Sequence, residues 1–251
     1  MRLIGPLFLT IVAGCGLGAA NASAQTAKPL TPWKALVSIN FGAELAMSPL
    51  EQASTLEAYV EPAPITAVVP GEPGAFFDAG ATVRVWKNLG VGAALSLVGT
   101  DSLAEVTADI PHPFYFDRPR VTSGDVNLWR QERAVHANAA WLVDRSPLAV
   151  LVFGGVSFFK VKTDLVTDIE FEEVFPYDTA TFVDAEVEQF DESAVGFNLG
   201  TDFTWRLARN WGVGGLVRYS RATVPLSIDG DDAGTFTAGG LSLGGGLRLT
   251  F

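Results

Sequence analysis

Cysteine is nearly absent, and the position of the single one decides whether thiol chemistry is available. Cys15 lies within residues 1–24, which have the features of an export signal. Cleavage after Ala24 would leave a mature chain without a thiol, which would exclude disulfides and thiol catalysis. The alternative is that Val12-Ala13-Gly14-Cys15 acts as a lipoprotein cleavage box, which would place a lipid on Cys15.

Basic residues are also scarce relative to acidic ones. The chain has 17 Lys and Arg against 28 Asp and Glu, a formal net charge of −11. Removing residues 1–24 takes away one charged residue, Arg2, so the mature charge becomes −12 (17 − 1 = 16 basic against 28 acidic). Nucleic-acid-binding proteins usually carry a basic surface, so this balance argues against a nucleic-acid partner.

The N-terminal segment has the three parts of a secretory signal. Arg2 precedes an apolar run from Leu3 to Ala20, and Ala22-Ser23-Ala24 follows as a small-x-small cleavage pattern. We therefore expect residues 1–24 to be a signal peptide and residues 25–34 to be a short periplasmic segment.

Long hydrophobic runs are missing from the rest of the chain. The longest candidate is Leu148–Phe159, twelve residues bounded by Arg145 and Lys160. A helix needs roughly 20 apolar residues to cross a bilayer, so a spanning helix is not predicted. An exported chain of this kind can be a soluble periplasmic protein, a secreted protein or a membrane β-barrel.

What the sequence does contain is repeated two-residue alternation. In residues 77–85, for example, Phe, Ala and Val alternate with Asp, Gly, Thr and Arg. Such alternation indicates a strand with one apolar face. The pattern predicts an all-β protein, a closed antiparallel up-and-down transmembrane β-barrel of about eight strands within residues 35–251. The strand segments are residues 37–43, 77–85, 91–97, 135–141, 148–159, 195–203, 213–219 and 241–251.

The connections between these segments alternate between short and long. Short periplasmic turns and long extracellular loops are typical of outer-membrane barrels. The short turns are residues 87–90, 143–147 and 208–212, and the long extracellular loops are expected near residues 46–74, 99–126, 165–190 and 227–235.

Five tryptophans fall near the short turns, at the same predicted rim as Phe251. Aromatic residues form girdles at membrane interfaces because their rings are apolar while the indole N–H needs a polar partner. A periplasmic aromatic girdle is therefore predicted from Trp33, Trp86, Trp141, Trp205 and Trp211.

The last segment, Leu241–Phe251, resembles the C-terminal assembly signal of bacterial outer-membrane barrels, with Leu247, Leu249 and the terminal Phe251 on one face. In plan, residues 33–251 are similar to the eight-stranded superfamily that includes the transmembrane domain of outer-membrane protein A. The resemblance implies an outer-membrane location and recognition by the barrel-assembly machinery.

Several charged side chains are predicted to face the barrel interior. An eight-stranded barrel has room only for side chains or one small ligand, and buried charges must pair. We therefore expect a structural ion-pair network, with a gated narrow ion path as the alternative. The residues concerned are Asp78, Arg84, Asp202, Arg206, Arg218 and Arg248.

Two of the long loops are acidic. Residues 164–192 carry eleven carboxylates and are predicted to form a hairpin above the membrane that turns near Pro176-Tyr177-Asp178. A second cluster, Asp229, Asp231 and Asp232, surrounds Gly230 and has the composition of a turn. Carboxylates bind hard cations, so a divalent-cation site is the alternative for residues 164–192, but no spacing there matches a calcium loop and no metal site is predicted.

The two histidines do not indicate catalysis. His112 lies between two prolines in a predicted loop, and His136 faces the predicted interior. A hydrolase would need a base within reach of a nucleophile, and no such grouping is visible. We expect neither catalytic residues nor cofactors.

The sequence therefore favours a non-enzymatic, monomeric outer-membrane barrel with a structural or surface-interaction role, in contact with outer-membrane lipid and lipopolysaccharide. The main alternative is a narrow channel for ions or small apolar molecules. A lipid-modifying enzyme and a soluble lipocalin-like binder are less favoured.

Overall fold

The computed structural model describes residues 33–45, 47–228 and 231–251, and within these ranges the chain forms eleven strands. Nothing in these ranges is a helix long and apolar enough to cross a membrane. The strands are β1 (Ala35–Glu44), β2 (Leu50–Ala58), β3 (Glu61–Val69), β4 (Gly74–Trp86), β5 (Leu89–Ile110), β6 (Arg120–Arg145), β7 (Leu148–Glu173), β8 (Ala180–Arg206), β9 (Trp211–Ile228), β10 (Asp231–Ala238) and β11 (Leu241–Thr250).

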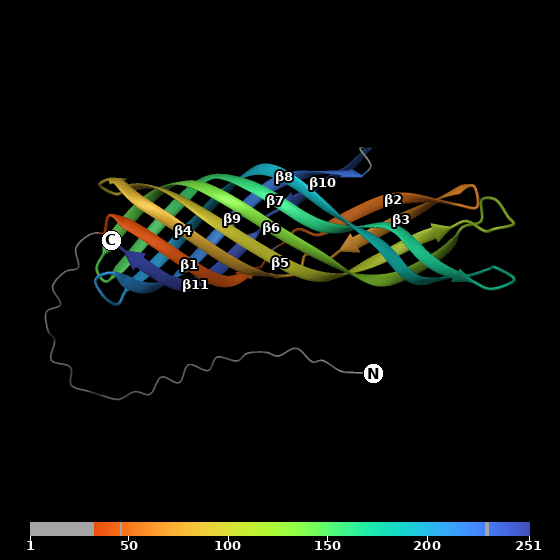
Figure 1. Ribbon diagram of the computed structural model, residues 1–251, viewed down its shortest axis with the longest axis horizontal. Helices are drawn as coiled ribbons and strands as arrows, with labels where there is room; N and C mark the ends of the chain where they lie inside the picture. Colours follow the sequence, from red (N-terminus) through yellow and green to blue (C-terminus); the bar gives the residue numbers. More distant parts are fainter. Residues whose placement is uncertain (1–32, 46, 229–230) are drawn as a thin grey trace, which may run out of the picture.

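Eight of these strands form a closed antiparallel ring in the order β1, β4, β5, β6, β7, β8, β9, β11. The ring closes where the first strand pairs with the last, for example at Val37↔Leu249 and Phe41↔Gly245. Closure satisfies every strand edge within the ring, which a sheet surrounded by lipid requires. The predicted all-β, eight-stranded barrel is confirmed (Figure 1).

The strands differ greatly in length, and the difference divides the molecule into two parts. β1 and β11 have 10 residues each, whereas β6 and β7 have 26 and β8 has 27. A tilted membrane strand needs about 9–11 residues. The long strands therefore continue well beyond the barrel and form an elongated part, which we call the extension (Figure 1, right).

The extension occupies regions where the sequence suggested loops. Within residues 46–74 the chain forms the β2–β3 hairpin, and β3 pairs with β5 at Ile65↔Ala108. β5 continues to Ile110, and β6 already begins at Arg120. The hairpin expected in residues 165–190 is present as the far ends of β7 and β8, with its turn between Glu173 and Ala180. In residues 227–235, β9 and β10 pair, while residues 229–230 lie outside the described part.

A buried glutamine joins the β2–β3 hairpin to the opposite wall of the extension. The side chain of Gln52 on β2 accepts a hydrogen bond from the backbone N–H of Val166 (3.0 Å) and donates one to its carbonyl oxygen. Val166 lies at a β-bulge, where the β7–β8 register shifts between Val166 and Asp168. The β6–β7 pairing ends at Arg130↔Thr163, three residues before Val166, and Gln52 supplies hydrogen-bond partners for both the N–H and the carbonyl oxygen of Val166.

The extension has its own hydrophobic core. It is built from small and β-branched side chains: Ala63, Ile65, Ala67, Ala104, Val106, Ala108, Ile110, Leu128, Val166 and Ile169. Two further buried clusters lie in the rest of the molecule. One includes Leu36, Leu142 and Phe153, and the other includes Phe159, Val224 and Phe236.

Candidate functional site

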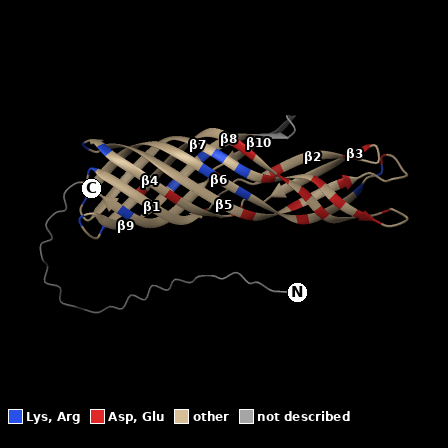
Figure 2. Ribbon diagram, viewed as in Figure 1, with Lys and Arg blue, Asp and Glu red and all other residues tan. Residues whose placement is uncertain are grey.

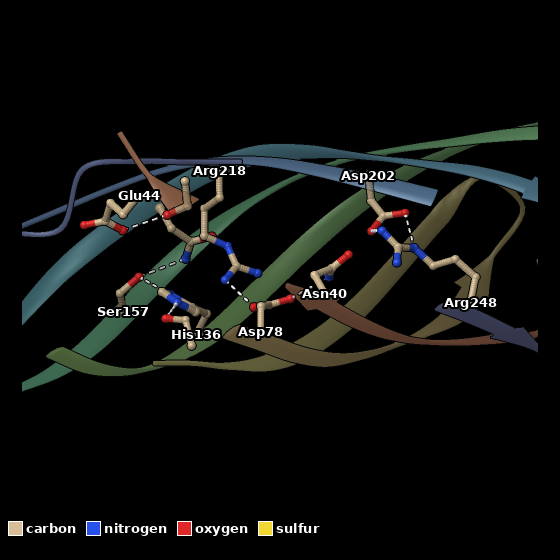
Figure 3. A network of polar contacts seen from close by, with 11 residues as sticks. Asn40, Glu44, Asp78, His136, Ser157, Asp202, Arg218 and Arg248 are labelled. Atoms are coloured by element: carbon tan, nitrogen blue, oxygen red, sulfur yellow. Dashed lines mark hydrogen bonds and ion pairs between the residues drawn. The ribbon is translucent and has the colours of Figure 1, made fainter. Parts of the chain in front are cut away.

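Among the buried ion pairs in the interior of the barrel, two that link distant strands are drawn in Figure 3. Arg218 on β9 lies 2.6 Å from Asp78 on β4, and Asn40 donates a second hydrogen bond to that carboxylate at 3.0 Å. Arg248 on β11 pairs with Asp202 on β8 through two nitrogens, at 2.9 and 2.8 Å. These four buried charged side chains therefore each have a partner of opposite charge, as burial away from water requires.

The remaining predicted interior arginines share a carboxylate that the sequence analysis did not identify. Arg206 lies 2.7 Å from Asp144, and Arg84 lies 3.4 Å from it. Asp144 was placed in a short turn, but β6 continues to Arg145, so its side chain follows the inward alternation of that strand. Four of the six predicted interior residues thus form two separate pairs, and the other two, Arg84 and Arg206, share Asp144.

A chain of neutral polar groups surrounds His136. Its Nε2 lies 2.9 Å from Ser96 Oγ and its Nδ1 lies 2.7 Å from Ser157 Oγ, which also accepts a hydrogen bond from Asn198 (3.0 Å). His136 is only 1 % exposed. Both ring nitrogens are occupied by serine hydroxyls, so no carboxylate orients this base as a catalytic triad would require.

Side chains fill the interior. The cavity between Asp78, Asn138, Phe153 and Arg218 has a volume of about 30 Å³. This is room for a few water molecules and not for a substrate. Nearer the extension, Glu132 accepts hydrogen bonds from Arg130 and from the backbone N–H of Gly239. Arg130 and Glu132 were not predicted from the sequence, although their inward positions follow from the alternation of β6.

The short-turn rim carries four of the five predicted girdle tryptophans on its outer surface. Trp86, Trp141, Trp205 and Trp211 are each about half exposed or more. Trp33 is different: it is 4 % exposed and packs inside the barrel, with the Arg84 guanidinium 5.1 Å from its ring centroid. Its placement in the girdle was wrong.

The backbone around Trp33 explains its inward position. The N–H of Lys34 donates to the carbonyl oxygen of Phe251, and the Lys34 carbonyl accepts from the N–H of Arg84. These bonds hold the chain against the barrel mouth, where the indole covers the end of the interior. Of the predicted assembly signal, Leu247, Leu249 and Phe251 all lie exposed on the outer face.

The far end of the extension presents a second candidate site, which we call the distal tip. It consists of three turns: residues 59–60 between β2 and β3, residues 111–119 between β5 and β6, and residues 174–179 between β7 and β8. Its exposed apolar side chains are Tyr59, Val60, Phe114, Tyr115, Phe116, Val174 and Phe175. Phe175 is 80 % exposed and Phe116 78 %. Large apolar groups gathered on one exposed surface are typical of an interaction site.

One buried arginine joins the β5–β6 and β7–β8 turns. Arg120 donates to the carbonyl oxygens of Pro111 (2.6 Å) and Tyr177 (3.0 Å), and its guanidinium lies 3.0 Å from the Glu173 carboxylate. The side chains of Arg120 and Glu173 are 5 % and 9 % exposed. This arrangement fixes the two turns relative to each other.

The β2–β3 turn is connected to the same ion pair. The Tyr59 hydroxyl donates to the Glu173 carboxylate at 2.9 Å. Partial desolvation, together with this hydrogen bond, raises the pKa of the Tyr59 hydroxyl above its ordinary value. All three turns of the distal tip therefore meet at one carboxylate and one guanidinium.

His112 has a structural role in the tip. Its Nδ1 accepts a hydrogen bond from the backbone N–H of Phe114 (3.1 Å), and its ring packs 4.8 Å from that of Tyr115. The Phe114 ring in turn contacts Tyr177 edge-on at 5.5 Å. The aromatic side chains are thus held by one another as well as by the backbone.

A cleft of about 200 Å³ lies beside the aromatic side chains. Four prolines form much of its lining, together with three carboxylates and one arginine. The lining residues are Glu61, Pro62, Pro64, Asp109, Pro111, Asp117, Arg118 and Pro119. The distal tip therefore combines an apolar surface with a mainly acidic border.

The outer surface of the extension is acidic over much of its length (Figure 2). Exposed carboxylates there include Asp101, Glu105, Asp125, Glu170, Asp184, Glu186 and Glu188. In the part of the chain that the structure describes, no group of three or more His, Cys, Asp or Glu side chains is arranged to hold a metal ion. Asp229 lies outside the described residues.

The chain matches no protein-family model and no curated protein. Among solved structures, it is similar to Neisserial surface protein A, with 12% identity, a TM-score of 0.47, and coverage of 86% of this chain and 97% of the other. It is also similar to OprG, an outer-membrane protein of Pseudomonas aeruginosa, at 11% identity and TM-score 0.43, covering 87% and 96%. A third is Ail, the attachment invasion locus protein of Yersinia pestis, at 11% identity and TM-score 0.38, covering 86% and 99%.

Proposed function

We propose that this protein is a non-enzymatic surface protein of the bacterial outer membrane. In this view the barrel anchors the chain, and the extension carries a preformed binding surface away from the membrane. The observation that carries the proposal is the distal tip, where exposed aromatic side chains are held in place by the buried Arg120–Glu173 pair. A fixed apolar surface loses little conformational entropy on binding, which favours recognition.

The membrane placement is supported by the exterior of the barrel. Outward side chains such as Val91, Leu95, Val152 and Phe203 are apolar and about half exposed, while their inward neighbours are polar or tightly packed. This is the polarity of a barrel surrounded by lipid. The short-turn rim would face the periplasm, and the extension would face outward. The assembly signal at Leu247, Leu249 and Phe251 would be read by the barrel-assembly machinery.

The dimensions of the extension fit this role. A strand of 26 residues such as β7 is roughly 85 Å long at about 3.3 Å per residue, and at a tilt of about 45° it still spans about 60 Å along the membrane normal. The hydrocarbon core of a bilayer is only about 30 Å thick. The tip would therefore stand well above the lipid head groups, where a partner can reach it.

The partner surface that fits the distal tip is apolar with a basic border. The exposed aromatic rings would be buried in the centre of the contact, as in many protein interfaces. The carboxylates Glu61, Asp109 and Asp117 next to them would face Lys or Arg side chains of the partner.

A binding experiment with defined peptides tests this proposal. The full chain, reconstituted in nanodiscs, is titrated with a fluorescent amphipathic leucine–lysine peptide and with its leucine–glutamate counterpart, and empty nanodiscs give the background. We expect preferential binding of the lysine peptide and a loss of at least tenfold in affinity in the variant Phe114→Ser/Phe116→Ser/Phe175→Ser. Equal binding by the variant would overturn the aromatic tip as the binding surface.

The channel alternative is tested separately. Conductance in planar bilayers should stay at the background level, because the cavity between the interior ion pairs is only about 30 Å³. Stable ion-selective steps that change in the variant Arg218→Met would favour the channel.

A further inference from the structure

The outer face of the barrel carries three basic side chains at the level where its apolar surface ends. Arg133 on β6 lies directly opposite Lys160 on β7, and Gln131 lies opposite Lys162. We call Arg133, Lys160 and Lys162 the basic triad. In Figure 2 basic residues of β6 and β7 gather near the middle of the molecule, between the barrel and the acidic extension.

The position of the basic triad along the strands is the first observation. One step of two residues toward the short turns, the outward row is Val135, Phe158 and Val195, and all three side chains are half exposed or more. Two residues along a strand correspond to about 7 Å. On β6 and β7 the basic triad therefore lies immediately beyond this apolar row, which places it at the depth of lipid head groups.

The cross-strand pairing is the second observation. Like charges directly opposite each other on one sheet face destabilise the sheet. Arg133 and Lys160 form such a pair, and no ion pair involves Arg133 within the described ranges, where its Nε donates to Gln131 at 2.9 Å. An anion between the two side chains would remove this repulsion.

Within the described part of the chain, one acidic side chain forms ion pairs with the triad. Asp191 lies 3.0 Å from the Lys160 ammonium and 3.8 Å from that of Lys162. Three basic groups against one carboxylate leave a local charge of +2 on a chain whose net charge is −11. The Lys160 side chain remains 56 % exposed despite its ion pair.

We propose that the basic triad binds the phosphate groups of a glycolipid in the outer leaflet, with the acyl chains of that lipid lying against the Val135–Phe158–Val195 row. Basic side chains at a membrane surface attract anionic head groups, and the apolar row beside them supplies the contact for the chains. The inference rests on the outer-membrane placement proposed above. The ligand is a lipid phosphate and not free phosphate, because the site borders an apolar surface.

The test uses the folded full chain and lipid A as the probe. Binding of lipid A with two phosphates and of its monophosphorylated form is measured by native mass spectrometry on protein released from phosphatidylcholine nanodiscs. We expect tighter binding of the form with two phosphates. The triple variant Arg133→Gln/Lys160→Gln/Lys162→Gln should bind about a hundredfold more weakly, at about fivefold for each charge.

A matched control exists at the other rim. Lys34, Lys87 and Arg145 are exposed near the short turns, and the variant Lys34→Gln/Lys87→Gln/Arg145→Gln removes the same charges as the triad variant. Its affinity for lipid A should equal that of the original protein. An equal loss in both triple variants would mean that overall charge governs binding and would overturn the site.

A gain-of-binding variant keeps the test independent of folding defects. Asp191→Asn removes the carboxylate that both lysines share, so it should strengthen lipid A binding several-fold. Unchanged or weaker binding would contradict the proposal. Displacement of lipid A by equimolar inorganic phosphate would instead identify free phosphate as the ligand.

A separate gel-mobility measurement tests the membrane placement independently of lipid A binding. The reconstituted protein should shift in gel mobility on boiling, as closed membrane barrels do. A protein that does not enter nanodiscs and shows no shift overturns the proposed function. A protein that enters nanodiscs and shifts in gel mobility, but binds lipid A no better than the triad variant, overturns only the lipid-phosphate site at the basic triad.

Discussion

The barrel and the extension are built from the same strands but have opposite polarity. Along β5, every second residue from Gly92 to Ile110 faces inward. In the barrel these inward positions include the polar Ser96, and the outward positions include Leu95. In the extension the inward positions are Ala104, Val106, Ala108 and Ile110, which are nearly inaccessible. The outward positions there include Asp101 and Glu105.

The strand geometry is thus continuous while the solvent changes. β5 and β6 pair without a register shift from Leu89↔Trp141 to Ile110↔Arg120, so no bulge resets the two faces. What changes is which face must be apolar, because in the proposed placement lipid surrounds the barrel and water surrounds the extension. A continuous pair of strands can therefore extend from lipid into water if its apolar residues face outward in the barrel and inward in the extension.

The largest effect is expected from breaking an ion pair inside the barrel. Arg218→Met leaves the Asp78 carboxylate buried without its cation, which should cost about 3–5 kcal/mol of unfolding free energy. Urea unfolding in phosphatidylcholine vesicles, followed by tryptophan fluorescence, measures this loss.

The double variant Arg218→Met/Asp78→Leu is the control for this first prediction. It removes both charges, so most of the lost stability should return. A single variant with the stability of the original protein would show that the interior is hydrated enough to solvate Asp78.

A charge placed in the core of the extension should affect only that part. Val106→Asp introduces an unpaired carboxylate at a position that is 0 % exposed, at a cost of about 3 kcal/mol. We expect proteinase K to cleave the extension of this variant, while the barrel keeps its shift in gel mobility on boiling. Leu103→Asp, three residues away and facing outward, should leave both parts intact. Loss of the mobility shift in Val106→Asp would mean that the two parts unfold together.

Two outward leucines of the same strand test the change of solvent directly. Leu95 lies in the barrel and Leu103 in the extension, and they are 42% and 51% exposed. Leu95→Arg should cost about 2 kcal/mol because the charge enters lipid away from the middle of the bilayer. Leu103→Arg should cost almost nothing, because this side chain faces water. Equal costs in the vesicle unfolding assay would contradict the assigned membrane boundary.

The same change of polarity explains which strands could be predicted from the sequence. In the barrel, regular alternation of large apolar and small polar residues predicted the eight strands and the inward direction of Asp78, Asp202 and Arg218. In the extension, several inward residues are alanines, such as Ala63 and Ala108, and the outward ones are acidic. That composition is typical of a solvated loop, so the additional strands were not predicted.

The interior ion pairs and the distal tip could be predicted only in part, because both are formed by contacts between segments far apart in the sequence. Alternation gives the direction of a side chain but not its partner, so the role of Asp144 was not visible. The run Phe114-Tyr115-Phe116 was a local signal of an exposed aromatic surface within an expected loop. Its connection to Glu173, through Arg120, depends on the pairing of β5, β6 and β7 and has no local signature.

The smallest expected effect concerns the distal tip, where two arginines two residues apart differ in burial. Arg120→Met removes the guanidinium that joins Pro111, Glu173 and Tyr177, at a local cost of about 1–2 kcal/mol because Glu173 can turn toward water. Faster amide hydrogen exchange is expected in residues 111–119 and 174–179, with no change in the barrel. Arg118→Met is the control, because its pair with Asp178 is more than half exposed on both sides and contributes little. Equal rates of amide hydrogen exchange in the two variants would mean that the three turns move independently. The exposed aromatic side chains would then not form a preorganised binding surface.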